Sequence, residues 1–140
     1  MNIEFDDNLI TGNQTIDDQH RELIQRISAF VQACEMGESK VKAIQMLDYL
    51  DEYTRFHFNA EEELQKNVGY PELKKHQEKH QELIQTIKDL YEYLDEYEGP
   101  NDRFVNLVQE KVVNWLFSHI KTFDRSVAEF IFLSDNPDRI

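Results

Sequence analysis

Five histidines and two carboxylates in this 140-residue chain recur at spacings typical of metal ligands. His57 and Glu61 are four residues apart, and so are His76 and His80. Residues four apart project from one face of an α-helix, one turn above the other, so each pair can grip one metal ion or two adjacent ions. The chain has no further histidine. The predicted ligands are His20, His57, Glu61, His76, His80, His119 and Asp124.

The residue types in this set favour a site for two metal ions. Neutral imidazole suits iron, zinc, copper and nickel, and carboxylate oxygens can bridge two ions. Seven ligands are too many for one tetrahedral ion, but they suit two ions that share their carboxylates. A single buried histidine is more often a core residue with a hydrogen-bond partner. Five together would cost on the order of several kcal/mol to desolvate if neither a metal nor such partners compensated them.

Four apolar stripes at helical spacing predict the elements that position these side chains. The stripes cover residues 16–31, 41–64, 73–94 and 104–123, and glycine-containing turn signals separate them. Short connections make neighbouring helices antiparallel. The sequence therefore predicts an all-α fold, an up-down-up-down antiparallel four-helix bundle with an irregular N-terminal arm, as a single domain over residues 1–140.

Antiparallel order brings all the predicted ligands to one end of this bundle. They lie near the start of the first and third stripes and near the end of the second and fourth. His119 and Asp124 are five residues apart, which on an ideal helix turns the second side chain about 140° away from the first. We therefore expect a π-bulge or a bend between Ile120 and Asp124.

Charge and composition limit the partners and the compartment. Fifteen basic and 28 acidic residues give a formal net charge of -13, which a nucleic acid or an anionic membrane would repel. No apolar run approaches the length of a membrane span, and no secretory signal is visible. The single cysteine, Cys34, excludes an intramolecular disulfide framework and fits a reducing compartment. We expect a cytoplasmic monomer with Cys34 buried and inert.

The segments that carry the predicted ligands resemble those of the hemerythrin family. All seven ligand positions of that family are filled. Two departures are visible: Phe5 stands where bacterial members usually have Trp, and Gln65 stands where Met is common. The resembling stretches are Thr11-Gly12 through Ile16-Asp17-Asp18-Gln19-His20, His57-Phe58-Asn59-Ala60-Glu61-Glu62, Tyr70-Pro71 with His76-Gln77-Glu78-Lys79-His80, and Trp115-Leu116-Phe117-Ser118-His119-Ile120-Lys121-Thr122-Phe123-Asp124.

The resemblance implies a pair of non-haem iron ions, bridged by Glu61, by Asp124 and by a solvent-derived oxo or hydroxo group. The iron held by His20 and His57 would then be one coordination place short, and by resemblance dioxygen would bind there. The histidines would divide as His76, His80 and His119 on one iron and His20 and His57 on the other.

The resemblance also places apolar residues around a pocket for dioxygen. On the residues alone these positions favour ordinary core packing, Trp115 included, and for Leu116 and Ile120 both interpretations stay open. The predicted pocket residues are Leu23, Phe58, Trp115, Leu116 and Ile120.

Reversible dioxygen binding, in oxygen carriage or storage and without catalytic residues, is the function that the resemblance implies. The chain contains no Glu-x-x-His motif, which dinuclear bundles that activate oxygen carry on two helices. Five neutral imidazoles with two acids stabilise high-valent iron poorly, which disfavours cleavage of the O–O bond. The alternatives are oxygen or redox sensing through a separate partner, and an enzyme such as a diiron oxidase, peroxidase or nitric oxide scavenger.

Overall fold

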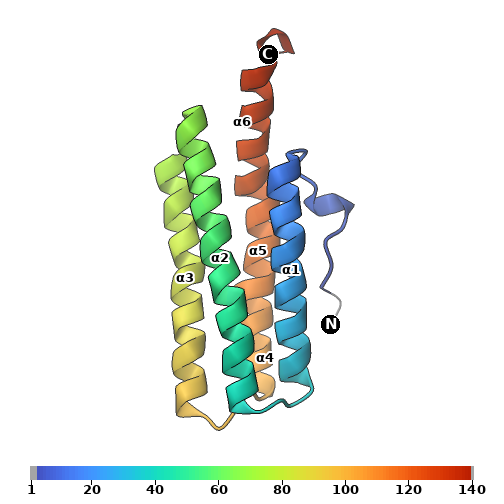
Figure 1. The fold of residues 1–140 in the computed structure, drawn as a ribbon, viewed down its shortest axis with the longest axis vertical. Coiled ribbons are helices and arrows are strands. Elements are labelled where there is room, and N and C mark those ends of the chain that lie inside the picture. The colour runs from blue at the N-terminus through green and yellow to red at the C-terminus, as the bar shows by residue number, and fades with distance from the viewer. Residues whose placement is uncertain (1–2, 140) are drawn as a thin grey trace.

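Helices joined by short turns make up the part of the chain that the structure describes. The computed structural model describes residues 3–139, and no β-strand occurs among them. The helices are α1 (Gln14–Glu35), α2 (Lys40–Val68), α3 (Leu73–Glu96), α4 (Asp102–Val108), α5 (Asn114–His119) and α6 (Arg125–Asp135). α1, α2, α3 and a fourth rod, made of α4, α5 and α6 in line, run alternately up and down, each beside the next (Figure 1). The fourth rod also packs against α1. This confirms the predicted all-α four-helix bundle.

Side-chain caps and glycines set the ends of these helices. Asn13 and Ser39 each accept a hydrogen bond from a backbone N–H in the first turn of α1 and α2, at 3.0 and 3.2 Å. Such caps satisfy donors that have no partner within the helix. Gly37 and Gly69 follow α1 and α2 with φ angles of 72° and 71°, a left-handed conformation that glycine adopts without steric cost.

Two π-helical segments interrupt the fourth helical rod, which consists of α4, α5 and α6 in line. They are Gln109–Val113 and Ile120–Asp124. The second confirms the irregularity expected between Ile120 and Asp124, whereas the first was not predicted. The rod also continues through α6, beyond the predicted stripe, and α6 rises past the ends of the other helices (Figure 1).

The N-terminal arm is irregular, as predicted, apart from a short 3₁₀ turn at Asp7–Leu9. Several contacts fasten it to the bundle. Leu9 is only 2 % exposed, and Arg125 at the start of α6 donates hydrogen bonds to the carbonyl oxygens of Asn8 and Ile10 at 2.6 and 3.3 Å. Farther on, the buried carboxylate of Asp17 accepts hydrogen bonds from the loop that leads into α1.

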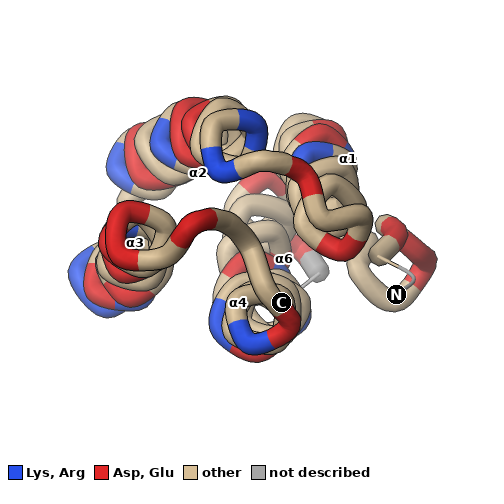
Figure 2. Tube along the Cα trace, turned by 90° about the horizontal axis from the view of Figure 1, so that it is seen from below, with Lys and Arg blue, Asp and Glu red and all other residues tan. Residues whose placement is uncertain are grey.

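The bundle has a far end, where α1 connects to α2 and α3 connects to α4, and a ligand end, where α1 begins. At the far end Phe30, Leu47, Leu94 and Phe104 are almost completely buried, and their packing is apolar. Acidic residues occur on all the helices seen from that end in Figure 2, as the net charge requires. No helix in residues 3–139 combines the length and apolar character that a membrane crossing needs.

Candidate metal centre

All seven side chains predicted as ligands meet inside the ligand end of the bundle. α1, α2 and α3 each carry one or two of the histidines, and the fourth rod carries the remaining histidine and the second acid. None of the seven is more than 4 % exposed. The antiparallel order of the helices therefore produces the convergence expected from the positions of these residues along the stripes.

The ligand atoms divide into two groups that share both carboxylates. In each group one atom from every residue lies within 4.8 Å of the others. Because Glu61 and Asp124 belong to both groups, the arrangement fits two adjacent cations bridged by two acids. We call them the three-histidine group (Glu61, His76, His80, His119, Asp124) and the two-histidine group (His20, His57, Glu61, Asp124).

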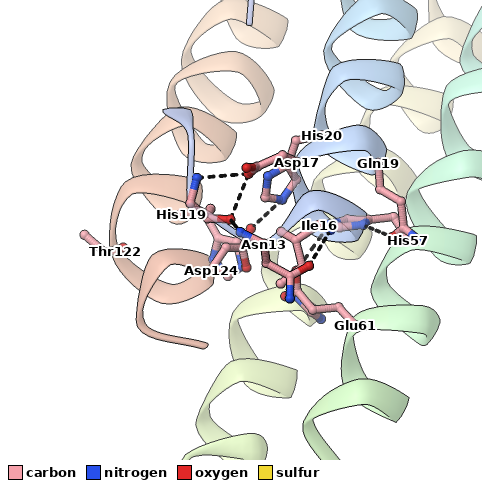
Figure 3. A network of polar contacts seen from close by, with 12 residues as sticks. Asn13, Ile16, Asp17, Gln19, His20, His57, Glu61, His119, Thr122 and Asp124 are labelled. Atoms are coloured by element: carbon pink, nitrogen blue, oxygen red, sulfur yellow. Dashed lines mark hydrogen bonds and ion pairs between the residues drawn. The ribbon is translucent and has the colours of Figure 1, made fainter. Parts of the chain in front are cut away.

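Close contacts join the two carboxylates to imidazoles of both groups, most of them from other helices. His76 Nε2 lies 2.8 Å from Glu61 Oε1 and 2.9 Å from Asp124 Oδ1. His20 Nε2 lies 2.8 Å from the other oxygen of Asp124, and His57 Nε2 lies 3.4 Å from Glu61 Oε2 (Figure 3). Each acid thus faces histidines of both groups, as a bridging ligand must.

The π-helical segment Ile120–Asp124 explains how two residues five apart can serve one site. A π-helical turn accommodates an extra residue, which turns Asp124 back toward the face that carries His119. In the structure His119 Nε2 lies 3.2 Å from Asp124 Oδ1. The local irregularity is therefore what places the second acid in the centre.

The two acids differ in acidity although both are buried. Burial, together with the nearby negative charge of Asp124, raises the pKa of Glu61 above its usual value. Burial would also raise the pKa of Asp124, but the imidazoles of His119, His20 and His76 outweigh it and hold that pKa well below its usual range. A pair of cations between these acids would favour the charged form of both.

The pKa values of the buried histidines differ as well. Burial lowers the pKa of His80 to about 4, and it lowers the pKa of His57 well below its usual value, with His20 nearby as a further cause. His76 is opposite: burial would lower its pKa, but hydrogen bonds with Asp124 and Glu61 raise it to about 9. Neutral imidazoles such as His57 and His80 are the form that binds a metal.

The second ring nitrogen of three of these histidines has a polar partner that the sequence did not point to. Nδ1 of His57 donates to Gln19 Oε1 at 2.7 Å, and Nδ1 of His80 donates to Glu62 Oε2 at 2.7 Å. Such partners orient metal-binding imidazoles. The side chain of Glu62 is only 22 % exposed, and this contact explains why.

Gln65 is completely buried, with its Nε2 3.0 Å from Nδ1 of His76. Its Oε1 is buried without a hydrogen-bond partner among the described residues. Rotating the amide by 180° would let that oxygen accept the Nδ1 hydrogen that His76 must carry when Nε2 binds a metal. The departure from Met at this position thus supplies a polar partner for a predicted ligand.

Several of the predicted ligand atoms are buried, and their close contacts with one another do not have hydrogen-bond geometry. Within residues 3–139 such orphaned buried atoms are uncommon, and a centre made of them calls for a further binding partner. Imidazole nitrogens with shared carboxylate oxygens are a donor set that suits iron. The residues therefore fit a pair of metal ions. The orphaned ligand atoms are His20 Nε2, Glu61 Oε1 and Oε2, His80 Nε2 and Asp124 Oδ2.

The residues predicted to line a dioxygen pocket all lie in or against the core. Leu23, Leu116 and Ile120 are fully buried and Phe58 is 3 % exposed, whereas Trp115 is half-buried. The Phe58 ring stacks on His80 with ring centroids 3.8 Å apart and an angle of 3° between the planes. Trp115 stacks on His119 at 4.6 Å and 11°. Whether these residues enclose dioxygen stays a prediction.

Two hollows in the surface reach the centre from different sides. One of about 350 Å³ lies between α1 and α2 and is lined by Gln19, Ala60 and Glu61 among others. Another of about 160 Å³ lies between α3 and the fourth rod and is lined by Trp115 and His119 among others. Each group of ligands therefore has a hollow beside one of its members.

Comparison with known proteins agrees with this geometry. The family described as "Hemerythrin HHE cation binding domain" matches residues 11–131, which include all seven predicted ligands. A bacteriohemerythrin of Pseudomonas paraeruginosa is 27% identical over 127 residues, covering 91% of this chain and 80% of the relative. Bacteriohemerythrins of Clostridium acetobutylicum (25% over 121 residues; 84% and 92% covered) and Aquifex aeolicus (27% over 118 residues; 84% and 88% covered) are also similar.

Proposed function

We infer the function of this chain from its family: it belongs to the hemerythrins, whose cation binding domain matches residues 11–131. We propose that it is a non-haem diiron protein that binds dioxygen reversibly and serves in oxygen carriage or storage in the cytoplasm. The observation that carries the proposal is the division of seven buried ligand side chains into two groups that share Glu61 and Asp124.

In this proposal the imidazoles of the three-histidine group would hold one iron and those of the two-histidine group would hold the other. Glu61 and Asp124 would serve both irons. The irons, when bound, supply the electrons that attach dioxygen reversibly. The five imidazoles are neutral donors, so they add no negative charge with which to stabilise highly oxidised iron.

The remaining residues control what reaches the centre. Leu23, Leu116 and Ile120 present only carbon and are fully buried, so they exclude water and small anions from that side. Phe58 and Trp115 cover His80 and His119 by stacking, which fixes the planes of both rings. Exclusion of water would support reversible binding, because water and small anions could then neither donate a proton at the centre nor compete with dioxygen for it.

An optical spectrum tests the proposal directly. Reduced, iron-loaded protein is recorded under argon, after oxygen is admitted, and after oxygen is removed, alongside a metal analysis. We expect two irons per chain and a visible band that appears with oxygen and disappears on its removal. One iron per chain, or a band that does not reverse, would overturn the proposal.

Two further measurements separate carriage from the alternatives. Steady-state oxygen consumption with an added reductant should be negligible for a carrier and substantial for an oxidase. Capture of partners by the reduced and the oxygenated protein should give no partner that binds one form alone, whereas a sensor acting through a separate protein requires such a difference.

A further inference from the structure

The polar partners of the histidine rings are unequal in charge. Glu62 is the only carboxylate among those identified at Nδ1 atoms within residues 3–139, and it lies 2.7 Å from His80. Gln19 and Gln65 are neutral amides. Glu62 belongs to α2 and His80 to α3, so the contact also ties two helices together across the three-histidine group.

A carboxylate partner changes a metal-binding imidazole more than an amide does. When Nε2 of His80 binds a metal, Nδ1 must carry the hydrogen, and an anionic acceptor holds that tautomer. The acceptor also makes Nε2 a more basic ligand. Because the Phe58 ring stacks on His80 at 3.8 Å, the plane of the imidazole is fixed as well. His80 is therefore oriented before any metal arrives.

The two-histidine group lacks a comparable arrangement. His57 has the amide of Gln19 as its partner, and Nδ1 of His20 is buried without a hydrogen-bond partner among the described residues, as is Nδ1 of His119 in the three-histidine group. This group also offers four ligand side chains, whereas the three-histidine group offers five. Ligand number and the charged partner of His80 therefore both favour the three-histidine group.

We propose that Glu62 is a positioning residue that makes the three-histidine group the tighter of the two metal sites and the first to be filled. The inference rests on the proposed function, because it requires two metal positions. It adds an order of assembly: one ion enters the three-histidine group with Glu61 and Asp124 as ligands, and the second ion then shares those two acids. Glu62 acts through His80 and does not touch the metal.

Titration of the metal-free protein with cobalt(II) under argon, followed by calorimetry and visible absorption, tests the order. Wild-type protein should bind two ions per chain in two resolved steps. Glu62→Gln keeps the shape of the side chain but removes its charge, and it should weaken the tighter step about 10–100-fold. The weaker step should change by less than threefold. Glu63→Gln removes the same charge from the neighbouring, exposed residue and should change neither step.

Two ligand variants assign the steps to the groups. His57→Ala should abolish the weaker step and keep the tighter one, and His119→Ala should abolish the tighter one. Because Glu62 lies at the edge of the core, Glu62→Gln should keep the helix content of the metal-free protein, as circular dichroism can verify. A loss of helix content in Glu62→Gln would give Glu62 a structural role in place of the proposed one.

The outcomes distinguish this inference from the proposed function. If wild type binds two ions but Glu62→Gln leaves the tighter step unchanged, or if His57→Ala removes the tighter step, the order of filling is wrong while the dinuclear centre stands. If wild type binds fewer than two ions, the dinuclear centre itself is wrong.

Discussion

At the far end of the bundle, Phe30, Leu47 and Phe104 fill the interior with carbon, whereas five imidazoles and two carboxylates lie equally buried at the ligand end. The far end is stabilised by burial of apolar surface, at about 25 cal/mol per Å². The ligand end gains less from that source, and each buried polar atom left without a partner costs about 1–3 kcal/mol. The far end therefore contributes most of the apolar stabilisation, whereas a pair of metal ions would offset the cost of burying the ligand end.

The largest effect should follow from removing an acid that both groups share. Glu61→Ala takes a bridging ligand from each group, so the protein should lose most of both irons and all reversible oxygen binding. Helix content should persist because the far end is unaffected. Metal analysis and circular dichroism would measure the two effects. The exposed Glu63→Ala is the matched control, and two irons retained in Glu61→Ala would contradict its role as a ligand.

Truncating one leucine at each end distinguishes the effect of lost packing from the effect of easier access to the centre. Leu116 and Leu47 are both fully buried, and truncating either to alanine should cost about 2–5 kcal/mol of unfolding free energy. Leu116→Ala should in addition autoxidise and bind azide faster than wild type, because it lies beside the ligands and the opening admits water and anions. Leu47→Ala should not.

Stopped-flow and absorbance measurements well below both melting temperatures would separate the effects of the two leucines. Equal autoxidation rates in wild type and Leu116→Ala would reduce Leu116 to an ordinary core residue.

The same contrast shows what could be predicted from the sequence. Ligand pairs four residues apart must lie on one face of their helix. Together with the antiparallel order of the helices, this predicted that the ligands converge. Even the π-helical segment at Ile120–Asp124 was predictable, because His119 and Asp124 could not otherwise face one site. The segment Gln109–Val113 spans no such pair, so nothing in the sequence marks it.

Contacts between side chains of different helices could not be predicted from spacing along the sequence. Glu62 follows a ligand by one residue, and on an isolated helix that position points away from the site. Only the packing of α3 against α2 brings His80 within 2.7 Å of it. The length of α6 could not be predicted for another reason: four consecutive apolar residues, Phe130 to Leu133, obscure the helical period there.

Helix caps offer a smaller test at both ends. Asn13 caps α1 at the ligand end, and Asn101 caps α4 at the far end while also accepting a hydrogen bond from the Tyr93 hydroxyl at 2.9 Å. Each substitution to alanine should cost about 0.5–2 kcal/mol, and Asn101→Ala should cost more because two hydrogen bonds are lost. Urea unfolding would measure both. A decrease in iron content in Asn13→Ala would show that this cap also positions His20.

The smallest effect is expected at Cys34, whose thiol packs in the apolar core of the far end. It is 4 % exposed, and burial raises the pKa of its thiol to about 12 from an ordinary 9.0. At pH 8 this raised pKa lowers the thiolate fraction about 1,000-fold, and the thiolate is the reactive form.

Alkylation of the folded protein at pH 8 should therefore be slower by at least that factor than alkylation in urea. The rate should rise about tenfold per pH unit while the fold persists, because pH approaches the raised pKa from below. Cys34→Ala should keep both irons and cost about 1 kcal/mol, far less than Leu47→Ala. Rapid labelling of the folded protein would show that the far end opens readily. That result would contradict its assignment as the more stable end of the bundle.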